Sequence, residues 1–305
     1  MRETVEIELR SRLAGRRDII VSMWRGIVVT LGVLVAQETP VIRVPVRLVA
    51  VPTLVYSREN RLIPGLKKGD FRVLDNGVPQ ALDLDTDDAP VSVVVAIQNN
   101  LDARAAVRYI TKVGSVMEAH LVGATGRAAV LAYGGDIKQL KPFGSGDVGL
   151  AFRTISAKGG TKGSKMRMID AGMEAIEMLK ERPRTHARVL LFIGQASDRG
   201  SERGWAALEQ QADRENVSIY ALTSSDAKTG PLSPIIAATG GTELHFHEQG
   251  ELENAIGTLG VELRSAYLLS YYPSSEEAGR HTISVEVAVP GARAYARPGY
   301  ILSPN

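Results

Sequence analysis

The sequence contains no cysteine, few aromatic residues and no marked excess of either charge. Without cysteine the chain can form neither disulfides nor thiolate metal sites, although this does not assign it to a compartment. Aromatic residues are 5% of 305, which argues against a nucleic-acid surface built on stacked rings. The formal net charge of +2 does not call for a polyanionic partner, so we expect no nucleic-acid binding. The 44% of apolar residues are enough for a folded protein of one large or two modest domains.

An apolar run long enough to span a membrane is also lacking, but the N-terminus carries a shorter one. Residues 23–37 read MWRGIVVTLGVLVAQ, in which Arg25 precedes an apolar stretch that ends near Ala36. A spanning helix needs about 20 apolar residues, so this stretch fits the core of a secretory signal better. We therefore interpret residues 1–37 as a leader, with translation starting at Met23, and expect export to the periplasm or the outside. A buried N-terminal strand or helix is the alternative.

Residues 38–89 are expected to form a small β segment. The stretch 41–53, VIRVPVRLVAVPT, alternates and is rich in valine, which is typical of a strand. Pro52 within it predicts an edge position or an interruption, because proline cannot donate to a strand ladder. The D-N-G sequence at 75–77 lies between two apolar runs and is a strong hairpin signal.

From position 90 to 266, short apolar runs alternate with amphipathic stretches. This predicts strands at 91–98, 127–134, 137–143, 187–193, 217–223 and 242–247, and helices at 102–121, 146–156, 164–182, 201–216, 232–239 and 250–266. We expect Ser164 and Ser201 to cap the helices that begin with them. Such alternation favours an α/β fold, with a central, mostly parallel sheet covered by helices on both faces.

The tail from 267 to 305 returns to a β pattern. Strands are predicted at 267–273, 281–289 and 292–300. Strands at both ends of a chain need partners. We therefore expect the N-terminal and C-terminal β extensions to pack together beside the central sheet.

Polar residues follow the first predicted strand of the α/β segment directly. Residues 91–103 read VSVVVAIQNNLDA, so an apolar strand runs into Gln98, Asn99, Asn100 and Asp102. Ligands of open α/β sheets bind outside the carboxyl ends of the strands. The sequence therefore predicts a binding site at this junction.

Seven stretches, taken in order, carry a resemblance to a known family. They are GLKKGDFRVLDNGVPQ (65–80), PVSVVVAIQNN (90–100), GGT (159–161), RVLLFIGQASDRGS (188–201), ATGGTELHF (238–246), ELRSAYLLSYYP (262–273) and ARPGY (296–300). In this ordered set the chain resembles a von Willebrand factor type A (vWA) domain, and more closely the VWFA-related, acidobacterial-type family of secreted bacterial proteins. The resemblance implies a Rossmann-like vWA core with β segments before and after it. It also implies binding rather than catalysis.

The resemblance further implies a metal-ion-dependent adhesion site, whose pattern begins with Asp-x-Ser-x-Ser after the first strand and adds a loop threonine. Carried onto this sequence, Gln98 stands at the first Asp position, and Asn100 and Asp102 stand at the two Ser positions. Thr161 matches the threonine. One expected carboxylate is therefore replaced by an amide, while a new carboxylate appears at Asp102.

The last element of that pattern is an Asp after the fourth strand, and here it is replaced as well. Gln195 stands at this position, or Gly194 if the register slips by one, while Asp198 lies three residues further on. Magnesium prefers carboxylate oxygens in an octahedron, and Lys162 and Lys165 would repel a cation. We therefore expect no metal cofactor. The alternatives are a weak Mg²⁺ or Ca²⁺ site on Asp102, Asn100 and Thr161, or a Lys162 ammonium paired with Asp102.

Other candidate motifs favour structural roles. His245 and His247 share one face of a strand, but the sequence shows no third ligand beside them. Ser197 and Asp198 lack the G-x-S-x-G context of a hydrolase. The KGGTKGS stretch lacks Walker spacing.

The function expected from the sequence is thus a non-enzymatic, exported module that binds a protein partner through a degenerate adhesion site. The binding residues would be Gln98, Asn100, Asp102, Thr161, Gln195 and Asp198. Once its signal is removed, it would not be an integral membrane protein. A structural role in an envelope assembly is a further possibility.

Overall fold

The computed structural model describes residues 48–85, 90–123, 125–144, 147–157, 163–224, 230–275 and 277–302. The expected leader and its start at Met23 lie outside the described residues, as does Thr161. All described residues belong to one unit, Pro45–Asn305.

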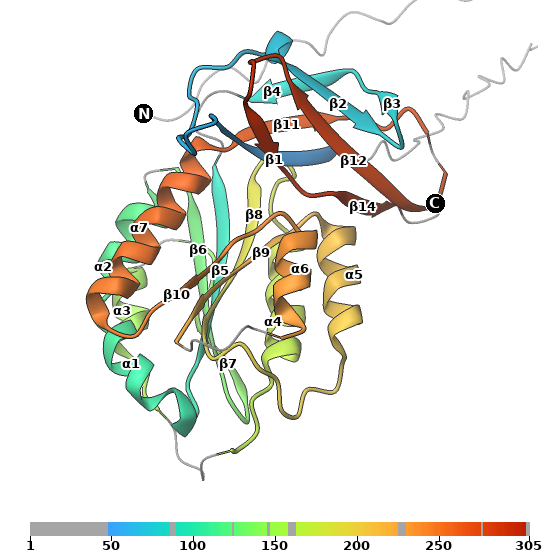
Figure 1. The fold of residues 1–305 in the computed structure, drawn as a ribbon. Helices are drawn as coiled ribbons and strands as arrows, with labels where there is room; N and C mark the ends of the chain where they lie inside the picture. Colours follow the sequence, from blue (N-terminus) through green and yellow to red (C-terminus); the bar gives the residue numbers. More distant parts are fainter. Residues whose placement is uncertain are drawn as a thin grey trace, which may run out of the picture. The chain divides into compact units, whose positions relative to one another are not determined.

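A six-stranded sheet forms the centre of this unit, in the order β10-β9-β8-β5-β6-β7 (Figure 1). Neighbouring strands pair in parallel except at the β6–β7 edge, which is antiparallel. The strands are β5 (Val91–Gln98), β6 (Arg127–Tyr133), β7 (Ile137–Lys141), β8 (Ala187–Gly194), β9 (Ser218–Thr223) and β10 (Glu243–His245). The mostly parallel sheet expected from the sequence is confirmed.

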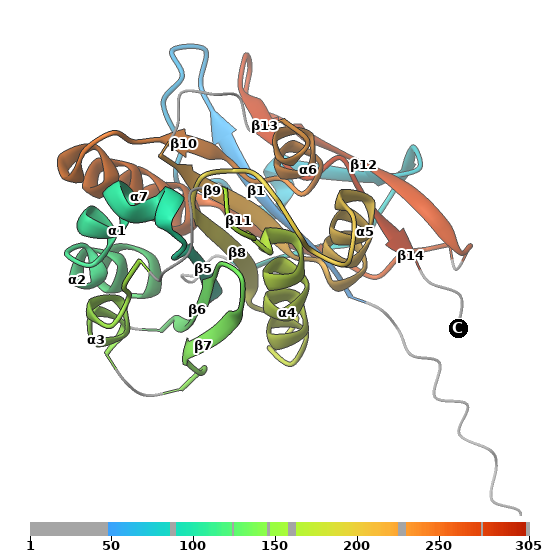
Figure 2. The same ribbon diagram turned by 90° about the horizontal axis from the view of Figure 1, so that it is seen from below.

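Helices cover both faces of this sheet (Figure 2). One face carries α1 (Arg104–Ile110), α2 (Gly114–Met117), α3 (Val148–Arg153) and α7 (Gln249–Ser265). The other face carries α4 (Met168–Lys180), α5 (Trp205–Glu215) and α6 (Leu232–Ala238). Across the described parts of the chain, no helix combines the length and apolar character that a membrane span requires.

Strand β5 shows how the sequence pattern produces these layers. All of its residues are buried, and successive side chains point to opposite faces. Val93, Val95 and Ile97 pack into the core beneath α1 and α7, whereas Val94 and Ala96 pack into the core beneath α4. A continuous apolar run is therefore what a strand at the centre of two cores requires.

The helix predicted over 102–121 is broken. The chain forms a short 3₁₀ turn (Leu101–Ala103), then α1, α2 and a π-helical turn (Glu118–Val122). Gly114 lies so close to α3 that a Cβ there would be 2.5 Å from the Cα of Gly149. This close tertiary contact positions α2, and the amphipathic pattern alone does not reveal it.

The two predicted serine caps are wrong. Helix α4 begins at Met168 and α5 at Trp205, with Arg167 and Gly204 as their N-cap residues. Ser201 does act as a cap, but on the other helix: its Oγ accepts a hydrogen bond from the backbone nitrogen of Asp170 in α4.

Strands from both ends of the unit pair with one another, as expected. One sheet has the order β13-β1-β11-β4 and the other β14-β12-β2-β3. Their bounds are β1 (Val49–Tyr56), β2 (Phe71–Asp75), β3 (Val78–Pro79), β4 (Leu82–Asp85), β11 (Tyr267–Tyr271), β12 (Gly279–Val287), β13 (Arg293–Tyr295) and β14 (Gly299–Leu302). A 3₁₀ turn, Lys68–Asp70, precedes β2.

Two sequence signals in this β part are explained by its backbone conformation and by its strand pairing. Asn76 and Gly77 both have positive φ, 49° and 80°, as the predicted hairpin turn requires. Pro52 lies in the half of β1 that pairs with β11, whereas β13 pairs only with Leu54–Tyr56. Proline is therefore tolerated where β1 has a single described neighbour.

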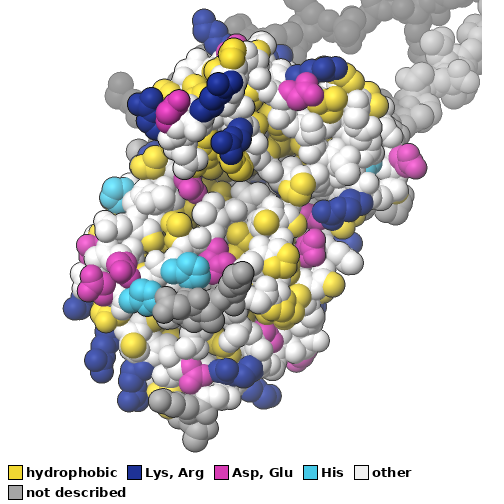
Figure 3. Space-filling model, in the orientation of Figure 1, with side chains coloured by type: hydrophobic (Ala, Val, Ile, Leu, Met, Phe, Trp, Pro, Cys, Tyr) yellow, Lys and Arg dark blue, Asp and Glu magenta, His cyan; other side chains and the backbone are white. Residues whose placement is uncertain are grey.

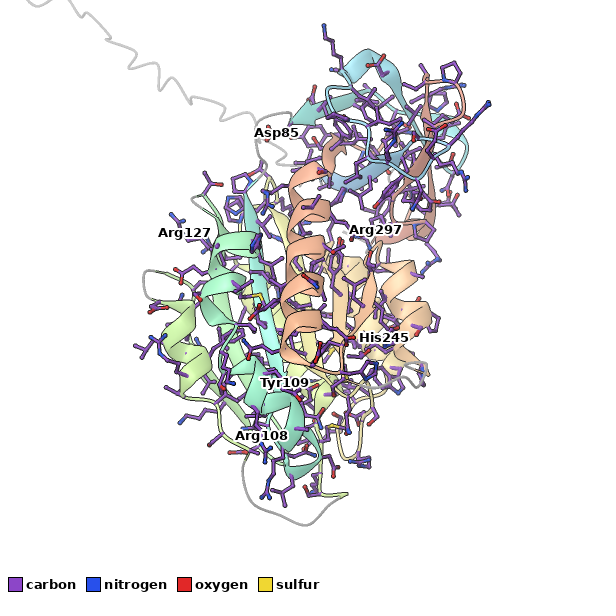
Figure 4. All side chains as sticks on the ribbon, turned by 60° about the vertical axis from the view of Figure 1, so that its left-hand side comes forward. Asp85, Arg108, Tyr109, Arg127, His245 and Arg297 are labelled. Carbon is purple, nitrogen blue, oxygen red and sulfur yellow. The ribbon has the colours of Figure 1, made fainter. Side chains whose placement is uncertain are left out.

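A buried ion pair ties the C-terminal strands to α5. Arg297 and Asp213 are 1% and 0% exposed, and Arg297 Nη2 lies 2.8 Å from Asp213 Oδ1. Arg280 Nη1 lies 3.0 Å from the other oxygen of Asp213, and Arg297 Nη1 also bonds Asn216 Oδ1. Figure 4 labels Arg297 beside the helices. Arg297 belongs to the ARPGY stretch, so this part of the family resemblance has a structural explanation.

A second buried polar cluster holds the β part together. Asp75 accepts hydrogen bonds from the hydroxyls of Tyr271 and Tyr300, at 2.9 and 2.8 Å. Its other oxygen lies 2.7 Å from His281 Nδ1, and His281 Nε2 lies 2.8 Å from the Glu277 carbonyl. Strands β2, β11, β12 and β14 thus meet at one carboxylate.

Candidate functional site

Three segments meet at the edge where the parallel strands end. Residues 98–102 begin with the last residue of β5, residues 195–201 follow β8, and residues 163–167 lead into α4. We call these three segments the rim. Five of the six predicted site residues lie in it, namely Gln98, Asn100, Asp102, Gln195 and Asp198.

Gln98 cross-links the ends of β5 and β8. Its side chain is fully buried, its Oε1 accepts a 2.5 Å hydrogen bond from the Gln195 backbone nitrogen, and its Nε2 donates to Asn100 Oδ1 at 2.7 Å. Gly194 has a φ of +146°, and a Cβ there would lie 2.5 Å from the Cβ of Gln98. Gln98 thus fills the space between the two strand ends with a neutral amide whose two polar atoms both have partners.

Asp102 is neutralised by an arginine from the loop after β8. Arg199 Nη2 donates to Asp102 Oδ2. The backbone nitrogen of Gly163 donates to both carboxylate oxygens, at 3.2 and 3.3 Å. The Asp102 side chain is 13% exposed and that of Arg199 is 45% exposed. The alternative pairing with Lys162 lies outside the described residues.

Arg199 is held in place through its backbone. Its nitrogen and oxygen bond the oxygen and nitrogen of Met166, at 2.9 and 2.8 Å. The next residue, Gly200, has a φ of +112°, and the Lys165 side chain lies against it, with Cγ 3.2 Å from where a Cβ would be. The backbone segments that carry Lys165 and Arg199 are therefore fixed to one another.

Asp198 caps α4. Its Oδ1 accepts from the Ile169 backbone nitrogen at 3.0 Å and from Ser201 Oγ at 2.6 Å. Ser201 Oγ in turn accepts from Asp170 N at 3.1 Å. The amides of a first helical turn have no partner inside the helix. The Asp198 carboxylate is therefore engaged in structure, and it bonds Ser201 rather than the neighbouring Ser197.

Asp170, the acidic residue in the first turn of α4, also uses its carboxylate in structural hydrogen bonds. Asp170 Oδ2 accepts from Arg167 Nε and Glu202 N, each at 3.0 Å. Burial by itself would raise the pKa of Asp170, but the hydrogen bonds from Glu202, Arg167 and Arg203 outweigh it and lower this pKa. Asp170 is thus a charged structural acid.

Two buried donors have no partner among the described residues: Asn100 Nδ2 in the rim, and the hydroxyl of Tyr133 at the end of β6 beside it. Tyr133 ends β6, directly beside Gln98 in the parallel register. Burial, and to a smaller extent the Asp198 carboxylate, raise the pKa of Tyr133. Its hydroxyl therefore keeps its proton, and the unmet hydrogen-bonding capacity at this point consists of N–H and O–H groups.

The described rim residues do not fit the divalent cation that the family resemblance implies. Such an ion needs several oxygen ligands, including one or two carboxylates. Asp102 instead faces the Arg199 guanidinium, and both polar atoms of Gln98 are occupied. Within the described ranges, no three His, Cys, Asp or Glu side chains are grouped to hold a metal. Thr161 is not described, so its contribution stays a prediction.

A second polar group lies at the ends of β9 and β10. His245 Nδ1 lies 2.7 Å from Thr223 Oγ1, and Glu243 Oε2 accepts from Ser233 Oγ at 2.9 Å. His245 Nε2 lies 3.8 Å from Glu243 Oε1. Histidine side chains lie beside acidic ones on the face drawn in Figure 3. These contacts agree with the expected strand-end role of His245.

Sequence reasoning did not identify Arg199 or Tyr133 as site residues. Arg199 stands directly after Asp198 in a loop that follows a buried strand, so its position was a usable signal. For Tyr133, the only signal in the sequence was its position near the end of a predicted strand. Neither pairing can be read from spacing, because Arg199 and Asp102 are 97 positions apart.

Comparison with known proteins shows similarity in structure only. No family model matches the chain, and no curated protein does. A solved structure described as von Willebrand factor type A from Catenulispora acidiphila aligns with a TM-score of 0.50 at 9% identity, over 85% of this chain and 74% of that one. BatB from Bacteroides thetaiotaomicron aligns with a TM-score of 0.42 at 13% identity, over 57% of this chain and 98% of that one. An aerotolerance-related membrane protein from Bacteroides fragilis aligns with a TM-score of 0.43 at 14% identity, over 56% and 99% of the two chains.

The first of these matches spans most of the chain. At such low identity it shows the fold alone. The chain has the Rossmann-like fold of a von Willebrand factor type A domain, with additional antiparallel strands from both of its ends.

Proposed function

We propose that this chain is an exported, non-enzymatic module that binds a protein partner through the rim, without a metal ion. The observation that carries the proposal is the Arg199 guanidinium on Asp102, at the point where the resemblance would place a cation. A permanently charged side chain in this position removes the need for a metal. The proposed site is thus a degenerate adhesion site.

Three further features support the proposal. The rim lies at the carboxyl ends of parallel strands, where α/β folds bind their ligands. The acids Asp198 and Asp170 are engaged in capping and ion pairing, so neither is offered as a general acid or base. Export is supported by the signal-like pattern of residues 23–37. A role within an envelope assembly would be one form of the same binding function.

The test is a capture experiment with matched variants. Immobilised protein would be exposed to an extract of the cells that encode it, once with EDTA and once with millimolar Mg²⁺. Ser197→Trp places a bulky side chain on the rim, whereas Ser115→Trp places the same bulk on the exposed side of α2. We expect Ser197→Trp alone to abolish capture of the specific partner, and EDTA to have no effect.

Two outcomes would contradict the proposal. Equal capture by wild type, Ser197→Trp and Ser115→Trp would mean that the rim is not the binding surface. Capture that needs Mg²⁺ would favour the alternative, metal-dependent adhesion through Asp102, Asn100 and Thr161.

A further inference from the structure

A group of positively charged side chains lies at the amino ends of the central strands, at the opposite end of the sheet from the rim. Arg127 begins β6, and Arg188 is the second residue of β8. In the strand register both are paired with Ser92 of β5. Because side chains alternate between the faces of a sheet, Ser92 points the same way as Val94 and Ala96, which pack beneath α4. The three paired residues therefore form a row on the α4 face.

The loop between α4 and β8 adds Arg182 and His186 to this row. His186 Nδ1 lies 2.9 Å from Ser92 Oγ, and Arg182 Nε donates to the same oxygen at 3.5 Å. Burial, followed by the charges of Arg182, Arg127 and Arg188, lowers the pKa of His186, so its ring is neutral. The Ser92 hydroxyl is buried, and its one described acceptor is His186 Nδ1. The imidazole proton is therefore on Nε2, which remains available as a donor.

Arg188 holds the loop that carries these side chains. It is buried, and it donates to the carbonyl oxygens of Lys180, Arg182 and Glu215. The Arg182 guanidinium also lies over the Phe143 ring, 5.0 Å from its centroid. The position of Arg182 is thus restricted before any ligand binds, which reduces the side-chain entropy that binding would cost.

Acidic side chains do not neutralise this group fully. Arg184 lies 3.9 Å from the Glu215 carboxylate, and Glu181 on the same loop is exposed to solvent. The described hydrogen bonds of Arg127 and Arg182 go to main-chain carbonyls and to the Ser92 hydroxyl, and none of them goes to a carboxylate. Within the described ranges, two guanidinium groups therefore lack a counter-charge.

The unused donors of this group are accessible to a ligand. Arg127 is exposed, and Arg182 and His186 are half-buried. Figure 4 labels Arg127 at the upper end of the sheet, far from Arg108 of α1 at the lower end. The described bonds use only Nη1 of Arg127 and Nε of Arg182, so both guanidinium groups keep N–H donors for another acceptor. Arginine forks fit carboxylates and phosphates alike, but donors from three side chains favour phosphate, which offers more oxygens.

We propose that Arg127, Arg182 and His186 form a second binding site, which takes a small ligand that carries a phosphate group. The two guanidinium groups bind phosphate oxygens, and His186 Nε2 donates a further hydrogen bond. Arg188 is buried and does not touch the ligand; it adds positive charge and positions the loop. This site is independent of the proposed function, because it lies at the other end of the strands from the rim.

The probes for this site are inorganic phosphate and glycerol 3-phosphate, which distinguish a free ion from a phosphate ester. Isothermal titration calorimetry in a phosphate-free buffer of low ionic strength would give the Kd of each, since charge contacts are least screened there. Acetate is the carboxylate reference and glycerol the uncharged one. We expect at least one phosphate compound to bind roughly tenfold more tightly than acetate, and glycerol not to bind.

Matched variants separate a specific contact from general charge. Arg127→Gln and Arg108→Gln each remove one exposed positive charge, but Arg108 lies on α1, away from this site. We expect Arg127→Gln to weaken phosphate binding roughly tenfold, the effect of losing one charge-assisted hydrogen bond, and Arg108→Gln to leave it unchanged. Arg127→Lys keeps the charge without the planar fork, so it should bind with intermediate affinity. Arg182→Gln should also weaken binding; if this variant does not fold, the exposed Arg127 decides the question.

Three outcomes would overturn the proposal: no binding of either phosphate compound, equal affinity for phosphate and acetate, or equal losses from Arg127→Gln and Arg108→Gln. The sequence also carries Asp87 and Asp88 shortly before β5. Phosphate binding that appears only in the Asp87→Asn/Asp88→Asn double variant would overturn it too, because the chain's own acids would then occupy the site. Ser197→Trp in the rim should bind phosphate as wild type does, so failure here leaves the proposed function untouched.

Discussion

The carboxylate of Asp198 accepts a 3.0 Å hydrogen bond from the backbone nitrogen of Ile169, 29 positions earlier in the chain. The loop after β8 is therefore also the cap of α4. This relationship assigns to structure an acid that the sequence placed among the binding residues. It also fixes the loop that carries Arg199, since Asp198 and Arg199 are neighbours.

Replacing this cap should destabilise the fold. We expect Asp198→Ala to lower the free energy of unfolding by about 1–3 kcal/mol, because it leaves helix amides without a partner. Asp198→Asn should lose less, since an amide oxygen can still accept. Glu174→Ala, an exposed change on the same helix, should stay within about 0.5 kcal/mol of wild type. Urea denaturation would measure all three, and an Asp198→Ala loss no larger than that of Glu174→Ala would refute the capping role.

Divalent cations should not stabilise the protein. A ligand present at about 100 times its Kd adds about 2.7 kcal/mol to the free energy of unfolding, which is easily seen as a raised Tm. Because Arg199 occupies Asp102, we expect the same Tm in EDTA and in millimolar Mg²⁺, Mn²⁺ or Ca²⁺. A raised Tm that disappears in Asp102→Asn would restore the metal-dependent alternative.

Stability should depend on the protonation of His281. This side chain is 2% exposed, and burial alone would lower its pKa. The Glu277 carbonyl and the Asp75 carboxylate outweigh burial and raise the pKa of His281 above its ordinary value. A group whose pKa is raised by folding stabilises the protein fully below its unfolded pKa, about 6.5. That contribution is lost as the pH rises through the higher, folded pKa.

The measurement is the difference in unfolding free energy between wild type and His281→Gln across this pH range. We expect the wild-type advantage to shrink as the pH increases. His120→Gln changes an exposed histidine and serves as the control. A difference that does not vary with pH would mean that His281 has the same pKa in the folded and the unfolded chain, which would contradict the prediction.

Removal of Arg297 should be among the most destabilising single changes. Arg297→Met would leave Asp213 with a buried charge and only Arg280 beside it. Loss of one partner from a buried ion pair costs about 3–5 kcal/mol. Arg293→Met, an exposed position on β13, is the matched control. Equal denaturation midpoints for the two variants would show that the Arg297–Asp213 contact does not stabilise the fold.

Local patterns predicted most of the elements. The strands at 91–98 and 187–193, the hairpin turn at 75–77 and the pairing of the two β ends all agree with the structure. Such features depend on side-chain period and on turn residues, which neighbours in sequence determine. The break between α1 and α2 was missed because a contact between Gly114 and Gly149 positions it.

The sequence by itself determined that a mostly parallel sheet with two helical layers would form, and that the ends of two of its strands would carry the amides of Gln98 and Gln195. Only the tertiary structure decided that Arg199 neutralises Asp102, that Asp198 caps α4, and that Arg297 joins the C-terminal strands to α5. The physical reason is the separation along the sequence of the residues that determine each feature. Periodicity governs which residues are buried within one element, but a hydrogen bond or ion pair between distant loops depends on where the whole sheet places their ends.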